Sequence, residues 1–185
     1  QMCIRDRNNS ASAFMMQLKD ILYRVHINSV TGSTQIPINQ VHFDSRKVSL
    51  DDLFVAIKGT ASDGHNFITS AVNQGAIAIV CEQIPETTVN GITYIEVEDT
   101  HAALAIMAAN LYGNPSKNLK LVGVTGTNGK TTVSSLLYQL FTKAGYKVGL
   151  LSTVKILVGA EEFKATHTTP DSLAINQYLK LMSDA

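Results

Sequence analysis

The sequence contains no tryptophan and only two cysteines, Cys3 and Cys81. Two cysteines provide neither a disulfide framework nor a metal-binding spacing, so we expect Cys81 to be a free buried thiol. Charged residues make up only 16% of the chain, with 15 Lys and Arg against 15 Asp and Glu. This balance excludes a general attraction to nucleic acid or to acidic membranes, so anion binding would require a local site.

Long hydrophobic runs are also absent. No apolar stretch approaches the roughly 20 residues of a membrane span, and residues 1–12 have no apolar core typical of a signal peptide. We interpret residues 1–12 as a disordered lead or an assembly artefact. Apolar residues nevertheless make up 45% of the 185 positions, which is enough for one or two packed domains.

The most informative stretch is the glycine-rich segment at residues 119–132. An apolar run at 119–124 precedes a glycine turn, a lysine, two threonines and an amphipathic helical pattern. Glycines let backbone N–H groups point inward, Lys130 supplies positive charge, and the Thr131 hydroxyl can bind Mg²⁺. The start of a helix adds its positive end. The predicted phosphate-binding residues are Gly126, Thr127, Asn128, Gly129, Lys130, Thr131 and Thr132.

The spacing of this loop departs from the common phosphate-loop pattern. That pattern has a glycine six residues before the lysine, whereas Val124 occupies this position and Gly123 stands one place early. The strand pattern before the loop and the helix pattern after it still favour a phosphate-binding site.

The first half of the chain alternates between helix and strand patterns, which predicts an α/β domain at residues 13–113. Buried strands are predicted at 53–57, 76–81 and 92–97, helices at 13–24, 67–75 and 102–112, and a polar loop at 31–40. Gly113, Asn114 and Pro115 break the pattern, so we place a linker at residues 114–118.

Residues 119–185 predict a second α/β unit. The pattern predicts strands at 119–124 and 147–151 in parallel, a helix at 131–144, a hairpin at 154–165, and a helix opened by Thr168 with Pro170 in its first turn. A phosphate-loop domain usually contains further strands, so we expect this unit to be incomplete and only marginally stable.

A second polar cluster consists of Asp44, Ser45 and Arg46, after a short strand. A serine hydroxyl and turn amides can bind a base or a diphosphate, and an arginine can pair with phosphate. The alternative is a local Asp–Arg ion pair with a capping serine, which the spacing alone favours.

Three sets of motifs occur in one order along the chain. They are Asp44-Ser-Arg46 with Asp63-Gly-His65, then Tyr112-Gly-Asn-Pro-Ser116 with the loop at 121–132, then His167-Thr-Thr-Pro-Asp171. On these motifs, residues 14–185 resemble the Mur ligase family of peptidoglycan synthesis, and residues 167–171 resemble its MurE branch. The family's own loop spacing also explains the displaced glycine.

The resemblance implies an N-terminal UDP-sugar-binding α/β domain followed by the first part of a P-loop-type central ATPase domain. It implies an ATP-dependent amide ligase that adds a diamino acid, meso-diaminopimelate or L-lysine, to UDP-N-acetylmuramoyl-L-Ala-D-Glu, with ATP and Mg²⁺ as cofactors. Lys130 would be catalytic and Thr131 a magnesium ligand. The implied UDP-sugar contacts are Phe43, Ser45, Arg46, Thr60, His167, Thr168 and Thr169. It further implies a cytoplasmic monomer that serves cell-wall biogenesis and cell division.

Several alternatives remain open. Thr168 and Thr169 can be a plain helix cap, and His26, His42, His65 and His101 are interpreted as surface or turn residues rather than metal ligands. A MurF-type ligase, folylpolyglutamate synthase or a non-catalytic nucleotide-binding module are the competing functions. Because the family's other magnesium ligands have no counterpart before Ala185, we expect this chain alone to be inactive.

Overall fold

The computed structural model describes residues 15–59, 62–159, 161–164 and 170–185. The chain divides into two compact units, Gln1–Met107 and Ala108–Ala185. The linker at residues 114–118 and the domain bounds around it stay predictions.

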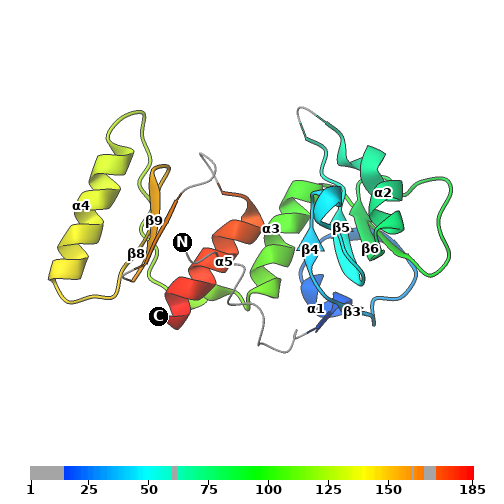
Figure 1. The fold of residues 1–185 in the computed structure, drawn as a ribbon, viewed down its shortest axis with the longest axis horizontal. Coiled ribbons are helices and arrows are strands. Elements are labelled where there is room, and N and C mark those ends of the chain that lie inside the picture. The colour runs from blue at the N-terminus through cyan, green and yellow to red at the C-terminus, as the bar shows by residue number, and fades with distance from the viewer. Residues whose placement is uncertain (1–14, 60–61, 160, 165–169) are drawn as a thin grey trace. The chain divides into compact units, whose positions relative to one another are not determined.

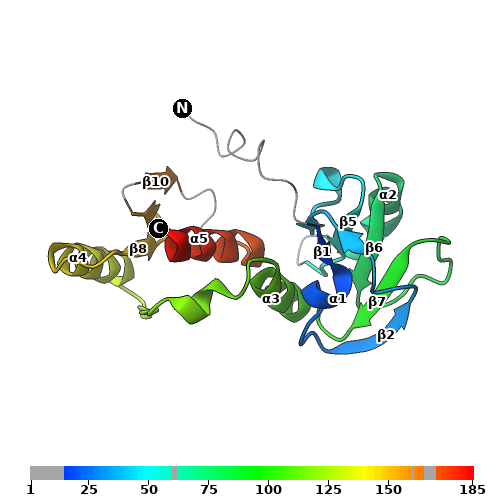
Figure 2. The same cartoon turned by 90° about the horizontal axis from the view of Figure 1, so that it is seen from below.

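The first unit is built on a five-stranded mixed sheet in the order β2-β7-β6-β5-β4. Its strands are β2 (Ile27–Thr31), β4 (Val41–His42), β5 (Asp52–Val55), β6 (Ala76–Cys81) and β7 (Thr93–Val97). Strands β4 to β7 run parallel, and β2 pairs antiparallel with β7. Figure 1 shows β4, β5 and β6 side by side, and Figure 2 shows β2 beside β7. The three buried strands predicted at residues 53–57, 76–81 and 92–97 are therefore confirmed.

Helices cover this sheet because its strands are apolar on both faces. Helices α2 (Ile68–Asn73) and α3 (Thr100–Leu111) follow strands, as in other crossover connections. One face buries a cluster against α2 that comprises Val48, Phe54, Ala56, Ile68, Ala71, Ala76, Ile79, Cys81 and Tyr94. Gly75 closes the turn after α2 with a φ of 110°, a conformation that glycine adopts without a Cβ penalty.

The first described residues differ from the long helix predicted at 13–24. Met16–Gln17 form β1, which pairs with β3 (Pro37–Ile38), and only Leu18–Ile21 form a helix, α1. Leu18 and Ile21 are fully buried, as the spacing predicted. The prediction of a longer helix was wrong because the preceding residues pair as a strand and Arg24 has a φ of 64°. Strands also occur within the predicted polar loop.

The described residues of the second unit form the end of α3, three further helical segments and an antiparallel sheet. Its elements are η4 (Pro115–Asn118), α4 (Lys130–Lys143), β8 (Gly149–Leu151), β9 (Lys155–Val158), β10 (Glu161–Lys164) and α5 (Ser172–Asp184). The sheet order is β10-β9-β8, and the predicted hairpin is confirmed by the pairing of Glu161 with Val158.

Three predictions for this unit were wrong. Residues 119–124 form no strand, and Leu121 and Val122 are 61% and 67% exposed, because no described strand pairs with this segment. Strand β8 consequently pairs antiparallel with β9 rather than parallel with 119–124. Helix α5 begins at Ser172, and its N-cap is Asp171, which accepts a hydrogen bond from Ala174 N at 2.8 Å. Pro170 therefore precedes the helix instead of occupying its first turn.

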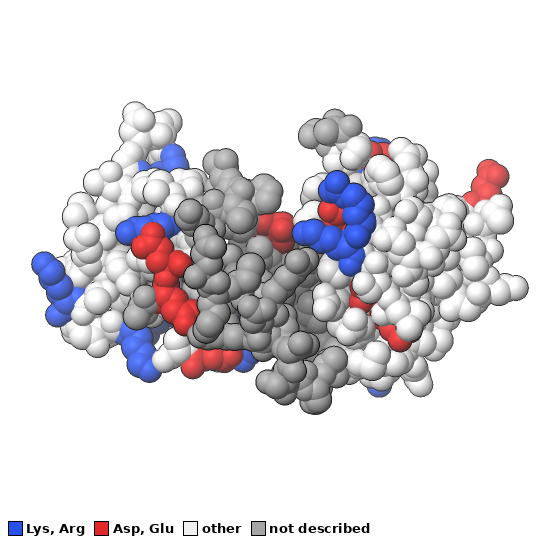
Figure 3. Space-filling view, viewed as in Figure 1, with Lys and Arg blue, Asp and Glu red and all other residues white. Residues whose placement is uncertain are grey.

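The surface agrees with the balanced composition. On the face drawn in Figure 3, acidic and basic side chains of the described residues lie in small groups separated by uncharged surface. Within the described parts of the chain, no helix is both long and apolar enough to cross a membrane.

Candidate functional site

The glycine-rich loop of the second unit leads directly into α4. Gly126 and Gly129 have φ values of 143° and 77°, which side-chain-bearing residues rarely adopt. Gly129 is the N-cap of α4 and provides no side chain to cap it. The first backbone N–H groups of a helix have no intrahelical acceptor, so this helix start leaves them available to an anion.

Lys130 is the first residue of α4, and its side chain turns back over the loop. Its Nζ donates hydrogen bonds to the carbonyl oxygens of Gly126 and Thr127, the second at 3.3 Å. The ammonium group is therefore held above the glycine turn, where a bound phosphate would need it. The next residue, Thr131, is exposed beside it.

These residues fit a bound polyphosphate. The loop combines two glycines with positive φ, an exposed helix start and a lysine held at the turn. For a metal ion the described residues offer much less. Among them, no group of three or more His, Cys, Asp or Glu side chains could hold a metal, so Thr131 would be one ligand among others from outside this set.

The second predicted site lies in the first unit, after β4. Asp44 accepts hydrogen bonds from the backbone N of Arg46 at 3.1 Å and from its guanidinium at 2.9 Å. Ser45–Lys47 form the short 3₁₀ helix η2 that this contact caps. The hydrogen bonds from the Arg46 side chain hold the pKa of Asp44 below its ordinary value. The local ion pair considered from the sequence is therefore present, and it engages the Arg46 guanidinium.

Phe43 and Ser45 leave the carboxyl end of β4, at the edge where α/β sheets commonly bind ligands. Phe43 is 36% exposed, whereas Ser45 is 9% exposed. Thr60, His167, Thr168 and Thr169, which were also predicted to contact the substrate, lie outside the described residues. Their roles stay predictions.

A polar depression of about 450 Å³ lies beside η2. It is lined by Asn39, Gln40, His42, Arg46, Lys47, Ser49 and Asp52. Asp52 is 1% exposed and accepts hydrogen bonds from Gln40 N and Ser49 N at 3.0 and 2.7 Å. Burial lowers the pKa of His42, although the nearby Asp52 carboxylate opposes that effect. The floor of this depression is thus an internally satisfied carboxylate, and we assign no ligand to it.

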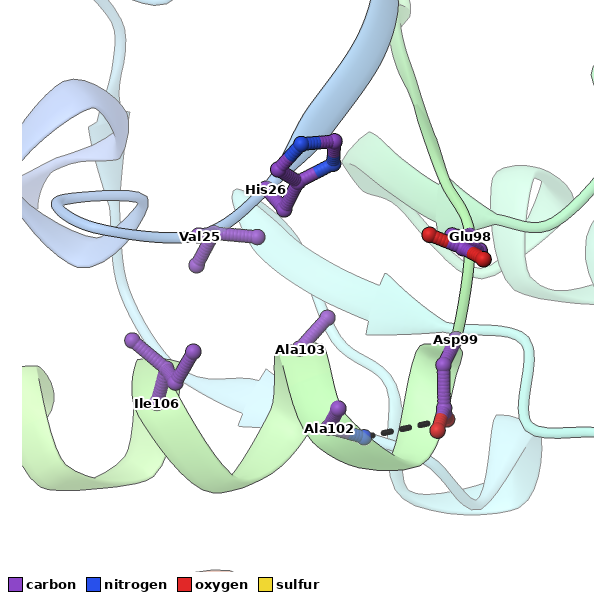
Figure 4. Close-up of a pocket in the computed structure, with 7 residues that line it drawn as sticks. All are labelled: Val25, His26, Glu98, Asp99, Ala102, Ala103 and Ile106. Atoms are coloured by element: carbon purple, nitrogen blue, oxygen red, sulfur yellow. Dashed lines mark hydrogen bonds between the residues drawn. The ribbon is translucent and has the colours of Figure 1, made fainter.

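A second, smaller depression of about 120 Å³ lies between the start of α3 and the chain before β2. Figure 4 shows Val25, Ala102, Ala103 and Ile106 lining it, with His26, Glu98 and Asp99 at its rim. Asp99 already accepts hydrogen bonds from the first backbone amides of α3, at 2.7 and 3.1 Å. The space is small and mainly apolar, and no predicted site residue reaches it.

A hydrogen-bonded group centred on His65 was missed from the sequence. The His65 ring contacts Asp63 and the backbone of Glu82, which follows β6. Hydrogen bonds from the backbone and side chain of His65 hold the pKa of Asp63 below its ordinary value. The Asp-Gly-His motif was a usable signal, but the partner Glu82 is 17 residues away in the chain.

The fold and the loop before α4 define the class as an α/β protein that carries a glycine-rich loop–helix unit of the phosphate-binding type. Comparison with protein families then gives the particular assignment. The model "Mur ligase family, catalytic domain" matches residues 37–112, and "Mur ligase middle domain" matches residues 124–185. The two matches together span most of the sequence, and the chain belongs to the Mur ligase family.

Curated relatives are similar over nearly the whole chain. The chain is 49% identical over 171 residues to the UDP-N-acetylmuramoyl-L-alanyl-D-glutamate--2,6-diaminopimelate ligase of Cytophaga hutchinsonii, with 92% of this chain and 35% of that protein covered. The protein of the same name from Bacteroides fragilis is 48% identical over 169 residues, with coverages of 91% and 35%. The chain therefore spans about a third of the length of these relatives.

Solved structures support the fold. A structure of UDP-N-acetylmuramoyl-L-alanyl-D-glutamate--2,6-diaminopimelate ligase aligns with a TM-score of 0.68 at 22% identity, covering 92% of this chain and 34% of that one. A MurF structure from Acinetobacter baumannii aligns with a TM-score of 0.53 at 19% identity, with coverages of 92% and 33%. At these identities the likeness concerns the fold alone.

Proposed function

We propose that this chain is part of an ATP-dependent ligase that joins 2,6-diaminopimelate to UDP-N-acetylmuramoyl-L-Ala-D-Glu. Two curated relatives at 48% and 49% identity carry that name. The observation that carries the proposal is the loop before α4, where the Lys130 ammonium is held over a glycine turn at an uncapped helix start.

The proposed reaction activates a carboxylate, which is a poor electrophile, by phosphorylating it. The γ-phosphoryl group of ATP passes to the D-Glu carboxylate and ADP leaves. The amine of the diamino acid attacks the carbonyl carbon, loses a proton and displaces phosphate. The protein must neutralise charge on the moving phosphoryl group, and Lys130 with the first amides of α4 would do so. Magnesium, held in part by Thr131, would supply further positive charge at the phosphates.

The UDP-sugar would bind to the first unit. Phe43 and Ser45 lie at the carboxyl end of β4, and Arg46 follows them in η2. Because Asp44 engages the Arg46 guanidinium, we assign Ser45 the leading role and Arg46 an auxiliary one. Thr60 is a further contact in the first unit that is proposed from the resemblance, and the roles proposed for His167, Thr168 and Thr169 rest on the resemblance alone.

Calorimetry with the 185-residue chain tests this proposal. We expect UDP-N-acetylmuramoyl-L-Ala-D-Glu and ADP to bind independently, each with one site, and we expect no tripeptide product from this chain alone. The matched competitor is the corresponding tripeptide precursor, which a MurF-type ligase would prefer. Failure to bind either nucleotide would contradict the proposal, and preference for the tripeptide precursor would favour the MurF-type alternative.

A further inference from the structure

The His65 ring is held at both of its nitrogens. Nδ1 lies 2.6 Å from Oδ1 of Asp63, and Nε2 accepts a hydrogen bond from the backbone N of Glu82 at 2.9 Å. A backbone N–H can only donate, so Nε2 carries no proton and Nδ1–H donates to Asp63. The ring is 19% exposed. Its contacts therefore select one neutral tautomer and one orientation.

The contact with Glu82 continues to the start of α3. Oε1 of Glu82 accepts hydrogen bonds from the backbone N and the hydroxyl of Thr100, at 3.2 and 3.0 Å. Thr100 is fully buried and is the first residue of α3. Hydrogen bonds thus connect the Asp63–His65 turn, the carboxyl end of β6 and the start of α3.

The same turn closes the base of the connection that follows β5. Lys58 and Asp63 form an antiparallel bridge, Gly59 N donates to Ser62 O at 3.1 Å, and Gly64 N donates to Ile57 O at 2.8 Å. A Cβ on Gly64 would lie 2.6 Å from backbone atoms of Ile57, so the segment that contains Gly64 packs directly against the segment that contains Ile57. The two ends of this connection are therefore hydrogen-bonded to each other, and His65 ties them to the chain after β6.

These residues share one edge of the sheet. Strands β4, β5 and β6 are parallel, so Ser45, Lys58 and Glu82, which follow them, leave the sheet at its carboxyl edge. Ligands of open α/β sheets bind at that edge. Lys58 is exposed there and adds a positive charge, suited to the diphosphate of a uridine nucleotide.

We propose that His65 is a positioning residue for uridine nucleotide binding: through Asp63 and Glu82 it fixes Lys58 and Gly59 at the carboxyl edge of the sheet, without contacting the nucleotide. This inference rests on the proposed function of the first unit. It assigns a role to a histidine that belongs to the Asp63-Gly-His65 motif and that the sequence analysis interpreted as a surface or turn residue.

Two substitutions of His65 separate positioning from a simple turn contact. In His65→Asn the shorter side chain can still bind Asp63 but cannot reach Glu82 N, whereas in His65→Gln the amide oxygen can accept that N–H. With UDP as the probe and the whole 185-residue chain, we expect His65→Asn to weaken binding about tenfold, or about 1.4 kcal/mol. We expect His65→Gln to remain within about twofold of the unchanged chain.

A matched control accounts for lost stability. Ile79→Val removes one buried methylene from β6 and leaves the His65 contacts intact, so it should lower the melting temperature without changing the dissociation constant for UDP. Amide exchange without nucleotide provides a second readout. Gly59 and Gly64 amides should exchange faster in His65→Asn than in His65→Gln or in Ile79→Val.

The outcomes are distinguishable. Equal UDP affinity for His65→Asn and the unchanged chain would overturn this inference and leave the proposed function standing. An unchanged chain that does not bind UDP would overturn the proposed function and the nucleotide part of this inference together. Unchanged exchange at Gly59 and Gly64 in His65→Asn would overturn the positioning claim whatever the binding result.

Discussion

Asp44 and Arg46 form a two-point contact across one intervening residue, with Oδ1 and Oδ2 of the carboxylate each 2.9 Å from a guanidinium nitrogen. The same carboxylate accepts the Arg46 backbone N–H, so it also fixes the turn that contains Ser45. The arginine is 86% exposed and the aspartate 24% exposed. This pair therefore shapes the predicted substrate site while occupying its arginine.

The Asp44–Arg46 pair should affect the titration of the Asp44 carboxyl group. Hydrogen bonds from Arg46 lower the pKa of Asp44, so their stabilising effect is present above the ordinary value of 3.8 and is lost as pH falls through the lowered pKa. We expect Arg46→Met to move the Asp44 pKa up towards 3.8, as measured by NMR of the side-chain carboxyl carbon. Lys47→Met is the control, since it removes a more weakly acting charge. An unchanged Asp44 pKa in Arg46→Met would contradict the pairing.

Removal of the Lys130 side chain should weaken nucleotide binding. Its ammonium is held over the glycine turn, and a hydrogen bond between charged groups contributes about 1.5–3 kcal/mol, so Lys130→Ala should weaken ADP binding by roughly tenfold to a hundredfold. Lys143→Ala, at the other end of the same helix, is the control and should bind ADP normally. Calorimetry gives the affinities, and circular dichroism should show α4 unchanged in both variants.

A side chain at position 64 should clash with the backbone of Ile57 and destabilise the first unit. An added Cβ would lie 2.6 Å from Ile57 N and O, so Gly64→Ala should lower the free energy of unfolding by about 1–3 kcal/mol. Gly91→Ala meets no atom within 4 Å but requires a φ of 87°, and it should cost about 1 kcal/mol. Urea denaturation measures both values. A cost for Gly64→Ala clearly below about 1 kcal/mol would show that the segments around Ile57 and Gly64 can move apart.

The buried thiol of Cys81 should make the free energy of unfolding fall as the pH rises above 9. Burial raises its pKa from an ordinary value of 9.0 to about 12. Above pH 9 the unfolded thiol loses its proton while the folded thiol keeps it, so Cys81 loses about 1.4 kcal/mol of stabilisation per pH unit until about pH 12. In a Cys3→Ser background, Cys81→Ala should therefore be destabilising at pH 8 and less so at pH 10.5. A constant difference in urea denaturation would contradict this.

Polar substitutions on the exposed face of helix α4 should have little effect on the free energy of unfolding. Leu136 and Leu140 are 58% and 61% exposed, and the helix has no buried residue. Leu136→Lys should therefore change the free energy of unfolding by less than about 0.5 kcal/mol. Met107→Ala, at a fully buried position, should cost about 2–5 kcal/mol. Leu136→Lys should also reduce binding of an apolar fluorescent dye, and a large loss of stability would show that this face is covered in solution.

The sequence predicted local features well. Strands β5 and β6 follow from largely apolar runs, β7 follows from the strand pattern after Gly91, and α4 begins one residue before its predicted start, directly after Gly129. The glycine turn before α4 could be predicted because glycine acts through local backbone geometry, and the phosphate-binding role of the loop residues stays a prediction. The pairing of Asp44 with Arg46 could also be predicted from the sequence, because Arg46 lies two residues away.

Features that depend on distant partners could not be predicted in this way. Residues 119–124 have the composition of a strand, but a strand requires a neighbour to accept its hydrogen bonds, and none of the described strands pairs with it. Residues 13–24 have helical spacing, yet Met16–Gln17 pair with β3 instead. The prediction that β8 pairs in parallel with residues 119–124 was wrong because strand pairing depends on which segments the fold brings together.

By itself, the sequence determined the α/β class and the family and predicted a phosphate-binding loop, because glycine turns, apolar runs and motif order are properties of neighbouring residues. Only the tertiary structure decided which nitrogen of His65 is protonated and which strands pair. The His65 contacts join residues 63, 65, 82 and 100, and folding alone places them together at the carboxyl edge of the sheet. Hydrogen bonds between segments distant in sequence depend on the path of the backbone, which no local pattern specifies.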